Sequence, residues 1–272
     1  MSIIGINYDK CSNCNLCLTT CLLYRKDKDK NKVILVDNPK FQCNLCGQCI
    51  ARCPEDAILY EGIGEAFTYE GIEKPETITS YDTIYKFLSA NRSTRLYKKK
   101  KVPPDTLKKV FEAMSRAPTA DNKRLERFSI LSDQDKMKTL NDAVLEAIYS
   151  IPERSERFGE LFRLTSRVFQ SPVYFDAPHV IFVDSPEDYP EDSEMQANNI
   201  GIIITYGRLA AQTLGLGTCW NGWTQIAIRF NPKIKELANI RGDIMGAFTI
   251  GYPAIRFKRS PPRYLKPIDG LE

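Results

Sequence analysis

The sequence has no uninterrupted apolar run near the roughly 18 residues that a membrane helix needs, so we expect no membrane span. The chain also lacks an opening basic region followed by a long apolar core, which argues against a secretory signal and predicts a cytoplasmic protein. Apolar residues make up 43% and charged residues 26% of the 272 residues, the usual balance for a folded protein with a core. Collagen-like, disordered and membrane-spanning classes are therefore excluded.

Nucleotide-binding loops are missing as well. The segment Gly215-Leu-Gly217 lacks the third glycine of the dinucleotide fingerprint and follows a predicted helix, and no P-loop pattern occurs. Histidine occurs once, as His179 at the start of a predicted strand, where a structural role is favoured over an acid/base role. The sequence thus offers no conventional nicotinamide site.

Cysteine is abundant but unevenly placed: eight of the nine lie between Cys11 and Cys53. In a reducing compartment such a cluster indicates metal binding before disulfides. The ninth, Cys219, stands beside Trp220 in an apolar turn, where an inert buried thiol is favoured over a redox role. The formal charge of +4 counts all thiols as neutral. Eight thiolates around two [4Fe-4S] cores would give each cluster a charge of about −2, so we expect no nucleic-acid binding.

Two cysteine blocks share the spacing Cys-x2-Cys-x2-Cys-x3-Cys, one starting at Cys11 and the other at Cys43, and Pro54 follows the second. Three thiolates at x2 spacing let a tight loop wrap three irons of a cubane, and the x3 cysteine of two-cluster proteins binds the other cluster. Structural zinc usually takes two cysteine pairs set well apart, which differs from this pattern. The expected ligand sets are Cys11, Cys14 and Cys17 with Cys53, and Cys43, Cys46 and Cys49 with Cys21.

These blocks resemble the bacterial two-[4Fe-4S] ferredoxins over nearly all of residues 1–60, although Leu22 stands where that family often has proline. We therefore expect a two-cluster ferredoxin-like domain over residues 1–62 and a linker over 63–80, where glycine and glutamate recur without a period. A second domain should span 81–272. Its periodicity predicts helices near 104–117, 133–147, 156–170, 192–214 and 232–238, and strands at 127–132, 179–184, 219–222 and 244–250. The predicted fold class is α+β.

Short polar motifs are spread through the second domain. Arg92, Ser93 and Arg95 place two guanidinium groups and a hydroxyl where they can grip a phosphate. Other motifs are Ala-Pro-Thr-Ala-Asp-Asn at 117–122, the run from 214 to 222, and Gly-Tyr-Pro at 251–253 with a basic segment after it. The order and spacing of these motifs resemble the FMN-dependent nitroreductase family across residues 81–265. The resemblance implies an α+β sandwich that binds FMN.

The resemblance also implies roles for the matching residues. The first motif would contact the FMN phosphate, ribityl chain or pyrimidine edge, and Asn122 the pyrimidine side of the ring. A backbone amide at Gly222 would face flavin N5, where glycine leaves room for a flat ring. The implied FMN contacts are Arg92, Ser93, Arg95, Pro118, Thr119, Asn122, Asn221, Gly222, Arg259 and Arg263. No side chain is expected to be catalytic, because the flavin carries the chemistry.

Two departures from the family pattern stand out. Asn91 replaces the first arginine of the opening motif, and Arg124-Leu-Glu126 replaces a Gln-Pro-Trp that borders the substrate pocket in relatives. The resemblance further implies a homodimer with FMN at the interface, in keeping with the apolar surface of the predicted helix near Ile200.

The combined expectation is an iron–sulfur flavoprotein oxidoreductase. Electrons from a donor such as ferredoxin would pass through two [4Fe-4S] clusters to FMN and on to an electron-poor organic acceptor, either nitroaromatic or quinone-like. Two alternatives stay open: an electron relay or redox sensor that serves a partner protein, and a specialised flavin reaction such as reductive dehalogenation. The sequence does not name the physiological acceptor or decide between ferredoxin and a nicotinamide donor.

Overall fold

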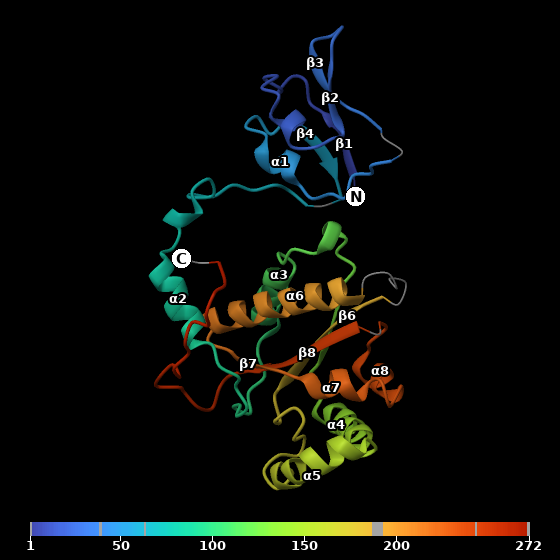
Figure 1. The fold of residues 1–272 in the computed structure, drawn as a ribbon, viewed down its shortest axis with the longest axis vertical. Coiled ribbons are helices and arrows are strands. Elements are labelled where there is room, and N and C mark those ends of the chain that lie inside the picture. Colours follow the sequence, from blue (N-terminus) through green and yellow to red (C-terminus); the bar gives the residue numbers. More distant parts are fainter. Residues whose placement is uncertain (1, 38–39, 63, 187–192, 243, 271–272) are drawn as a thin grey trace. The chain divides into compact units, whose positions relative to one another are not determined.

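The computed structural model describes residues 2–37, 40–62, 64–186, 193–242 and 244–270. The chain forms two compact units (Figure 1). The first comprises Met1–Thr79 together with Asp121–Arg124, and the second comprises Ser80–Ala120 and Leu125–Glu272. The segment expected to be a linker is thus grouped with the first unit.

The first unit is built from two antiparallel strand pairs. Strand β1 (Ser2–Ile6) pairs with β4 (Ile58–Glu61), and β2 (Tyr24–Asp27) pairs with β3 (Lys32–Leu35). Short helical turns stand between them: η1 (Leu16–Thr19), α1 (Gln48–Arg52) and, near the end of the unit, η2 (Pro75–Thr77). The buried core is small and consists of Ile6, Tyr24, Val33, Cys49, Ala57 and Ile58.

A four-stranded antiparallel sheet forms the centre of the second unit, in the order β5-β6-β8-β7. Its strands are β5 (Arg127–Leu131), β6 (His179–Ser185), β7 (Gly217–Trp220) and β8 (Ile244–Gly251). Every residue of β6 is buried, because both faces of the sheet are covered. Val180 and Phe182 belong to the hydrophobic core on one face, and Ile181 and Val183 to the core on the other, as strand alternation requires.

Helices form the outer layers (Figure 1). Helices α3 (Pro104–Met114) and α6 (Ser193–Thr213) cover one face, while α4 (Gln134–Tyr149), α7 (Gly222–Ala227) and α8 (Lys233–Ala238) cover the other. Helix α5 (Pro152–Thr165) packs on α4. Helices α3 and α6 approach closely at Gly207, where an added Cβ would lie 2.6 Å from Met114 Cγ.

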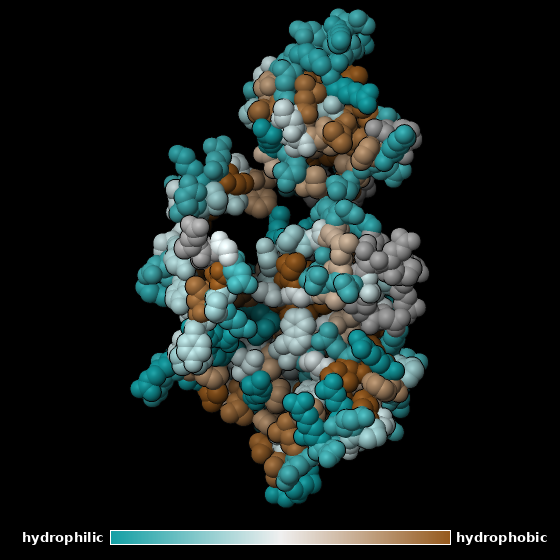
Figure 2. Space-filling view, in the orientation of Figure 1, coloured by the Kyte–Doolittle hydropathy of each residue, from teal (hydrophilic) through white to brown (hydrophobic). Residues whose placement is uncertain are grey.

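Helix α2 (Tyr81–Ala90) differs from the other helices of this unit because none of its residues is buried. Tyr81, Ile84 and Tyr85 are exposed, with Tyr81 80% exposed, and the two tyrosine rings stack on each other. Figure 2 shows that apolar side chains also gather in local patches elsewhere on the face that it presents. The described helices include none that is long and apolar enough to cross a bilayer.

The predicted mixed helix and strand architecture of the second domain is confirmed, with two local differences in the bounds of its elements. The strand expected at 219–222 lies at Gly217–Trp220, and Gly222 starts α7 instead. The reason is Asn221, whose side-chain oxygen accepts hydrogen bonds from the Thr224 backbone N–H at 3.1 Å and hydroxyl at 2.9 Å. An N-capping asparagine ends the strand and begins the helix. The helix expected from 156 begins earlier, at Pro152, and ends at Thr165.

Candidate functional site

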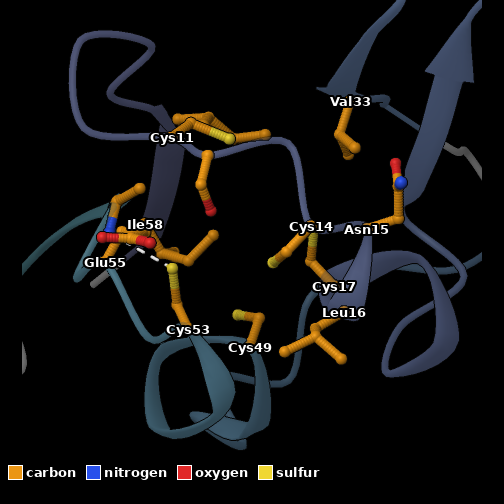
Figure 3. Close-up of a pocket in the computed structure, with 13 residues that line it drawn as sticks. Cys11, Cys14, Asn15, Leu16, Cys17, Val33, Cys49, Cys53, Glu55 and Ile58 are labelled. Carbon is orange, nitrogen blue, oxygen red and sulfur yellow. Dashed lines mark hydrogen bonds between the residues drawn. The ribbon is translucent and has the colours of Figure 1, made fainter.

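Cysteines from both blocks line one pocket of the first unit (Figure 3). Cys11, Cys14 and Cys17 reach it from the first block, and Cys49 and Cys53 from the second. About 390 Å³ in and around the pocket is free of protein atoms, and part of this volume is open solvent. Its remaining walls are mainly apolar, with Ile6, Val33, Ala57 and Ile58 among them. Four of the five sulfur atoms are those of the first expected ligand set, including the x3 cysteine of the other block.

The two cysteine loops share two left-handed backbone positions. The residue before the second cysteine of each block is left-handed, with φ of 58° at Asn13 and 56° at Leu45. The residue after that cysteine is left-handed too, with φ of 64° at Asn15 and 73° at Gly47. Leucine seldom adopts this conformation, so its presence at the position matching Asn13 indicates that both loops have one required shape.

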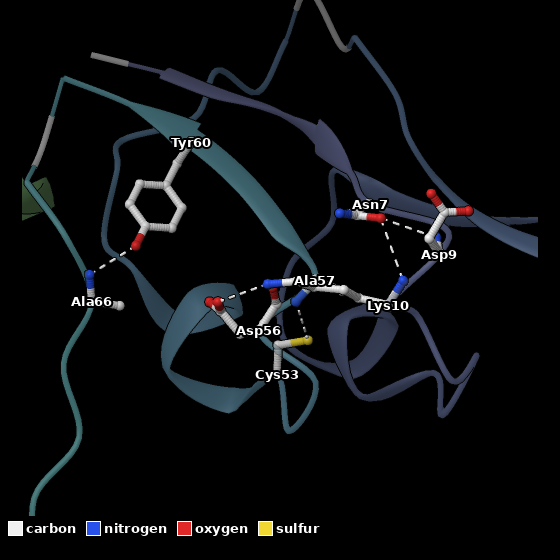
Figure 4. A network of polar contacts seen from close by, with 8 residues as sticks. All are labelled: Asn7, Asp9, Lys10, Cys53, Asp56, Ala57, Tyr60 and Ala66. Carbon is white, nitrogen blue, oxygen red and sulfur yellow. Dashed lines mark hydrogen bonds and ion pairs between the residues drawn. The ribbon is translucent and has the colours of Figure 1, made fainter.

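Backbone amides point at two of the sulfur atoms. The N–H of Ala57 donates to Cys53 Sγ at 3.3 Å (Figure 4), and the N–H of Leu45 donates to Cys43 Sγ at 3.4 Å. Such donors stabilise a thiolate over a thiol. Nearby, an ion pair of 3.3 Å joins Lys10 Nζ to Asp56 Oδ2, but both groups are exposed, so its contribution to stability is small.

Burial and neighbouring thiols shift the pKa values of two of these cysteines. Burial raises the pKa of Cys17, and the Cys11 and Cys14 thiols nearby add to the rise. Burial also raises the pKa of Cys49, and there the additional contributions come from Cys21 and Cys43. The x3 cysteine of the first block therefore lies within electrostatic reach of the second block.

No three His, Cys, Asp or Glu side chains of the described residues converge on a point suited to a single metal ion. A [4Fe-4S] core has a different requirement, because each thiolate binds a different iron of the cube. Figure 3 shows sulfur atoms of both blocks on separate walls of the pocket, which is the kind of arrangement that such a core requires.

A basic pocket of the second unit brings together four of the residues expected to contact FMN. Arg92, Ser93, Arg95 and Arg263 line an open hollow of about 790 Å³. The hollow is also lined by Asn91, Arg208 and Phe257, and none of its described lining residues is an Asp or Glu.

The opening motif is held in place by the edge strand of the sheet. Ser93 forms a parallel β-bridge with Thr218 of β7, and the Thr94 N–H donates to the Thr218 carbonyl at 2.9 Å. Thr94 is buried against Gly217, where an added Cβ would lie 2.4 Å from Thr94 Oγ1. These contacts hold the backbone between Arg92 and Arg95, whose side chains line the pocket.

Arg208 is a pocket residue that sequence reasoning missed. It extends from α6, and its guanidinium donates to Thr218 Oγ1 at 3.2 Å and to Asn91 Oδ1 at 3.4 Å. Asn91 in turn donates to Gln212 Oε1 at 2.7 Å. Burial lowers the pKa of Arg208, and none of the described ion pairs includes it. The available signal was a lone arginine in the otherwise weakly polar stretch from 200 to 211.

The remaining expected FMN contacts do not line this hollow. Asn122 donates from its side-chain amide to the carbonyls of Asn44 and Leu45, both at 2.9 Å, within the first unit. Asn221 is buried and caps α7, while open space surrounds the position that a Gly222 side chain would take. Pro118, Thr119 and Arg259 also lie outside the lining, although Ser260 beside Arg259 accepts a 2.8 Å hydrogen bond from Arg92. Their contacts with FMN stay predictions.

His179 is held by two hydrogen bonds. Its Nε2 accepts a hydrogen bond from the Val102 backbone N–H at 2.9 Å, so Nε2 is unprotonated. The ring proton is then on Nδ1, which lies 2.6 Å from Ser132 Oγ. Burial, with Lys101 nearby, lowers the pKa of His179 to about 4. These contacts tie the lysine-rich segment at 98–101 to the sheet.

Comparisons with known proteins agree with the second unit. The model of the nitroreductase family matches residues 88–252. Solved structures with a similar fold include an FMN-bound nitroreductase from Bacteroides fragilis, at 21% identity and a TM-score of 0.53, which aligns over 70% of this chain and 96% of its own. An FMN-dependent nitroreductase from Clostridium difficile R20291 has 19% identity and a TM-score of 0.55, and it aligns over 70% of this chain and 99% of its own. A variant of the FMN and NADPH-dependent nitroreductase of Sphigopyxis sp. strain HMH has 17% identity and a TM-score of 0.51. It aligns over 69% of this chain and 99% of its own. No curated protein matched the chain.

Proposed function

The chain belongs to the nitroreductase family of FMN-dependent oxidoreductases, and we propose that it is an iron–sulfur flavoprotein. In this proposal a donor such as ferredoxin delivers electrons to two [4Fe-4S] clusters in the first unit. The clusters pass them to FMN, which reduces an electron-poor organic acceptor of the nitroaromatic or quinone class. Bound FMN supplies two-electron chemistry at its N5 atom, and the clusters supply single electrons.

The arginine pocket supports the FMN site. Four guanidinium groups, those of Arg92, Arg95, Arg208 and Arg263, line one hollow that no described carboxylate shares. Such an arrangement is unfavourable without a bound anion, because like charges repel. A dianionic phosphate relieves the repulsion through charge-assisted hydrogen bonds. Arg208 also supplies a cation beside Asn91, where the family pattern has arginine. We infer that Arg208 takes over the phosphate contact that Asn91 lacks.

The first unit supports the clusters on three grounds. Its cysteine loops repeat one backbone shape, its pocket collects sulfur atoms from both blocks, and its protein core is small. Domains of this size seldom fold on so few buried apolar residues without disulfides or a bound metal group. All nine cysteines are free thiols in the structure, so disulfides do not supply the missing stability. The pocket lined by cysteines of both blocks is the observation that carries the proposal.

A homodimer is part of the proposal. Helix α2 buries none of its residues, and Tyr81, Ile84 and Tyr85 are exposed. Helix α6 buries Ile203 and Ile204 on one side, while Ile202 and Tyr206 on the other side are 38% and 41% exposed. A second copy that covers these apolar side chains would remove them from water. The nature of the acceptor and a cytoplasmic location also remain proposals.

The joining of two units in one chain favours clusters as the entry point for electrons. Tethering keeps the local concentration of the clusters high whatever the level of free donor. A flavin fed by hydride alone would have no use for single-electron groups.

Cofactor analysis tests the proposal. Protein purified without oxygen should contain about eight irons, eight acid-labile sulfides and one FMN per chain. Reduced ferredoxin should then support reduction of a panel of nitroaromatic and quinone acceptors. Zinc in place of iron, or protein without flavin, would contradict the proposal. Full cofactor content without turnover of any small acceptor would instead favour the electron-relay alternative.

A further inference from the structure

The Tyr24 hydroxyl is a buried polar group without a conventional partner. Tyr24 opens strand β2 and is only 5% exposed, yet its oxygen makes no hydrogen bond of full geometry with any described residue. Leaving such a hydroxyl unpaired in a core usually costs about 1–3 kcal/mol. A residue of this kind in a small core therefore needs an explanation.

Cysteine side chains pack with Tyr24 in this small core. Tyr24 and Cys49 belong to the same buried cluster, and their side chains interact, although no hydrogen bond of full geometry joins them. Cys17 and Cys21 are also near enough to act electrostatically on Tyr24. The tyrosine thus stands beside cysteines of both expected ligand sets.

The protonation state of the phenol suits a donor. A phenol with its ordinary pKa of about 10 keeps its proton at neutral pH. A thiol offers this donor only a weak acceptor, whereas a metal-bound thiolate offers a strong one.

We propose that Tyr24 donates its O–H to the sulfur of Cys49 and thereby raises the reduction potential of the cluster that Cys43, Cys46, Cys49 and Cys21 hold. The inference rests on the proposed function, because it requires that cluster to be present. Hydrogen bonds to the sulfur atoms are among the factors that set cluster potentials. Reduction adds negative charge to the cluster, so a hydrogen bond donated to its sulfur stabilises the reduced state more than the oxidised state. Tyr24 thereby gives the two clusters different reduction potentials.

Potentiometric titration followed by EPR on anaerobically purified full-length protein tests this inference. Tyr24→Phe removes only the hydroxyl. One of the two cluster potentials should fall, with the equilibrium constant for its reduction lowered roughly tenfold, or about 59 mV for a one-electron couple. The affected signal should be the one that Cys46→Ser alters, and the other cluster should keep its potential.

Tyr8→Phe is the matched control. Its hydroxyl lies in the same unit but donates to the Val33 carbonyl at 3.0 Å, away from any sulfur. Both potentials should stay unchanged in that variant. If Tyr24→Phe lowers the iron content, 3,5-difluorotyrosine at position 24 provides a near-isosteric stronger donor, and the potential of the same cluster should rise.

Unchanged potentials in Tyr24→Phe with full iron content would overturn the inference while leaving the clusters in place. Equal shifts of both potentials would overturn it as well, because the donor is assigned to one cluster. Absence of any cluster signal in the wild-type protein would refute the proposed function itself, and the two failures are therefore distinguishable.

Discussion

Replacing Arg208 tests whether the basic pocket is built for the phosphate of FMN. Arg208→Met keeps much of the aliphatic length of the side chain but removes the guanidinium that contacts Thr218 and Asn91. A hydrogen bond to a charged partner contributes about 1.5–3 kcal/mol, which corresponds to roughly 10- to 150-fold in affinity. We therefore expect FMN to bind the apo protein 10- to 150-fold more weakly.

Riboflavin makes the assay specific, because it carries the same ring and ribityl chain without the phosphate. Quenching of flavin fluorescence should show a loss of affinity for FMN and little change for riboflavin in Arg208→Met. The stability of the apo protein should fall by less than about 1 kcal/mol, since Arg208 has no described carboxylate partner and shares its pocket with other arginines. Arg167→Met, which removes an exposed arginine after α5, is the matched control and should leave both affinities unchanged.

Equal losses for FMN and riboflavin would refute the reasoning, because the guanidinium would then act on the shape of the site and not on the phosphate. Unchanged FMN affinity would refute it more directly. Arg208→Lys should retain part of the affinity, since lysine preserves the charge but not the forked donor geometry of arginine.

Three further predictions concern the clusters, the helix packing and the pH dependence. Cys21→Ser should alter the Mössbauer spectrum in the same way as Cys46→Ser, because the x3 cysteine binds the cluster of the other block; a change confined to its own block would refute the crossed arrangement. Gly207→Ala should lower the free energy of unfolding by about 1–3 kcal/mol because of the tight contact between α3 and α6. Gly201→Ala in the same helix meets open space and should raise the free energy of unfolding by about 0.5–1 kcal/mol. Urea titrations that give the two variants the same stability would contradict the packing. Burial lowers the pKa of His179 from 6.5 to about 4. The stabilising contribution of the neutral ring is therefore present above pH 6.5 and is lost as the pH falls toward 4, by up to about 3 kcal/mol in all. Urea titrations across this range should show a steeper decline in stability for wild type than for His179→Gln.

The shared spacing of the two cysteine blocks predicts similar loops, and the structure places Cys53 in one pocket with cysteines of the first block. That these cysteines hold clusters stays a prediction. The strands of the second domain were predictable, since the apolar run of β6 is buried on both faces.

Contacts that depend on distant segments were not predictable. Arg208 reaches the pocket only because α6 packs across the edge of the sheet that also holds Ser93, more than a hundred positions earlier. The start of α7 at Gly222 was missed because the capping role of Asn221 competes with the apolar pattern that favours a strand. Tyr24 illustrates the same limit, because its unpaired buried hydroxyl is visible only in three dimensions.

Reduction of bound FMN by reduced ferredoxin in an anaerobic stopped-flow instrument tests the central claim most directly. Wild-type protein should show bleaching of the clusters' absorbance before the flavin absorbance falls, because electrons enter at the clusters. Cys49→Ser should retain its FMN and still reduce acceptors when the flavin is reduced chemically, but it should lose most of the ferredoxin-driven flavin reduction. Equal flavin reduction by NADPH in wild type and Cys49→Ser, with no response of wild type to ferredoxin, would contradict the claim that the clusters feed the flavin.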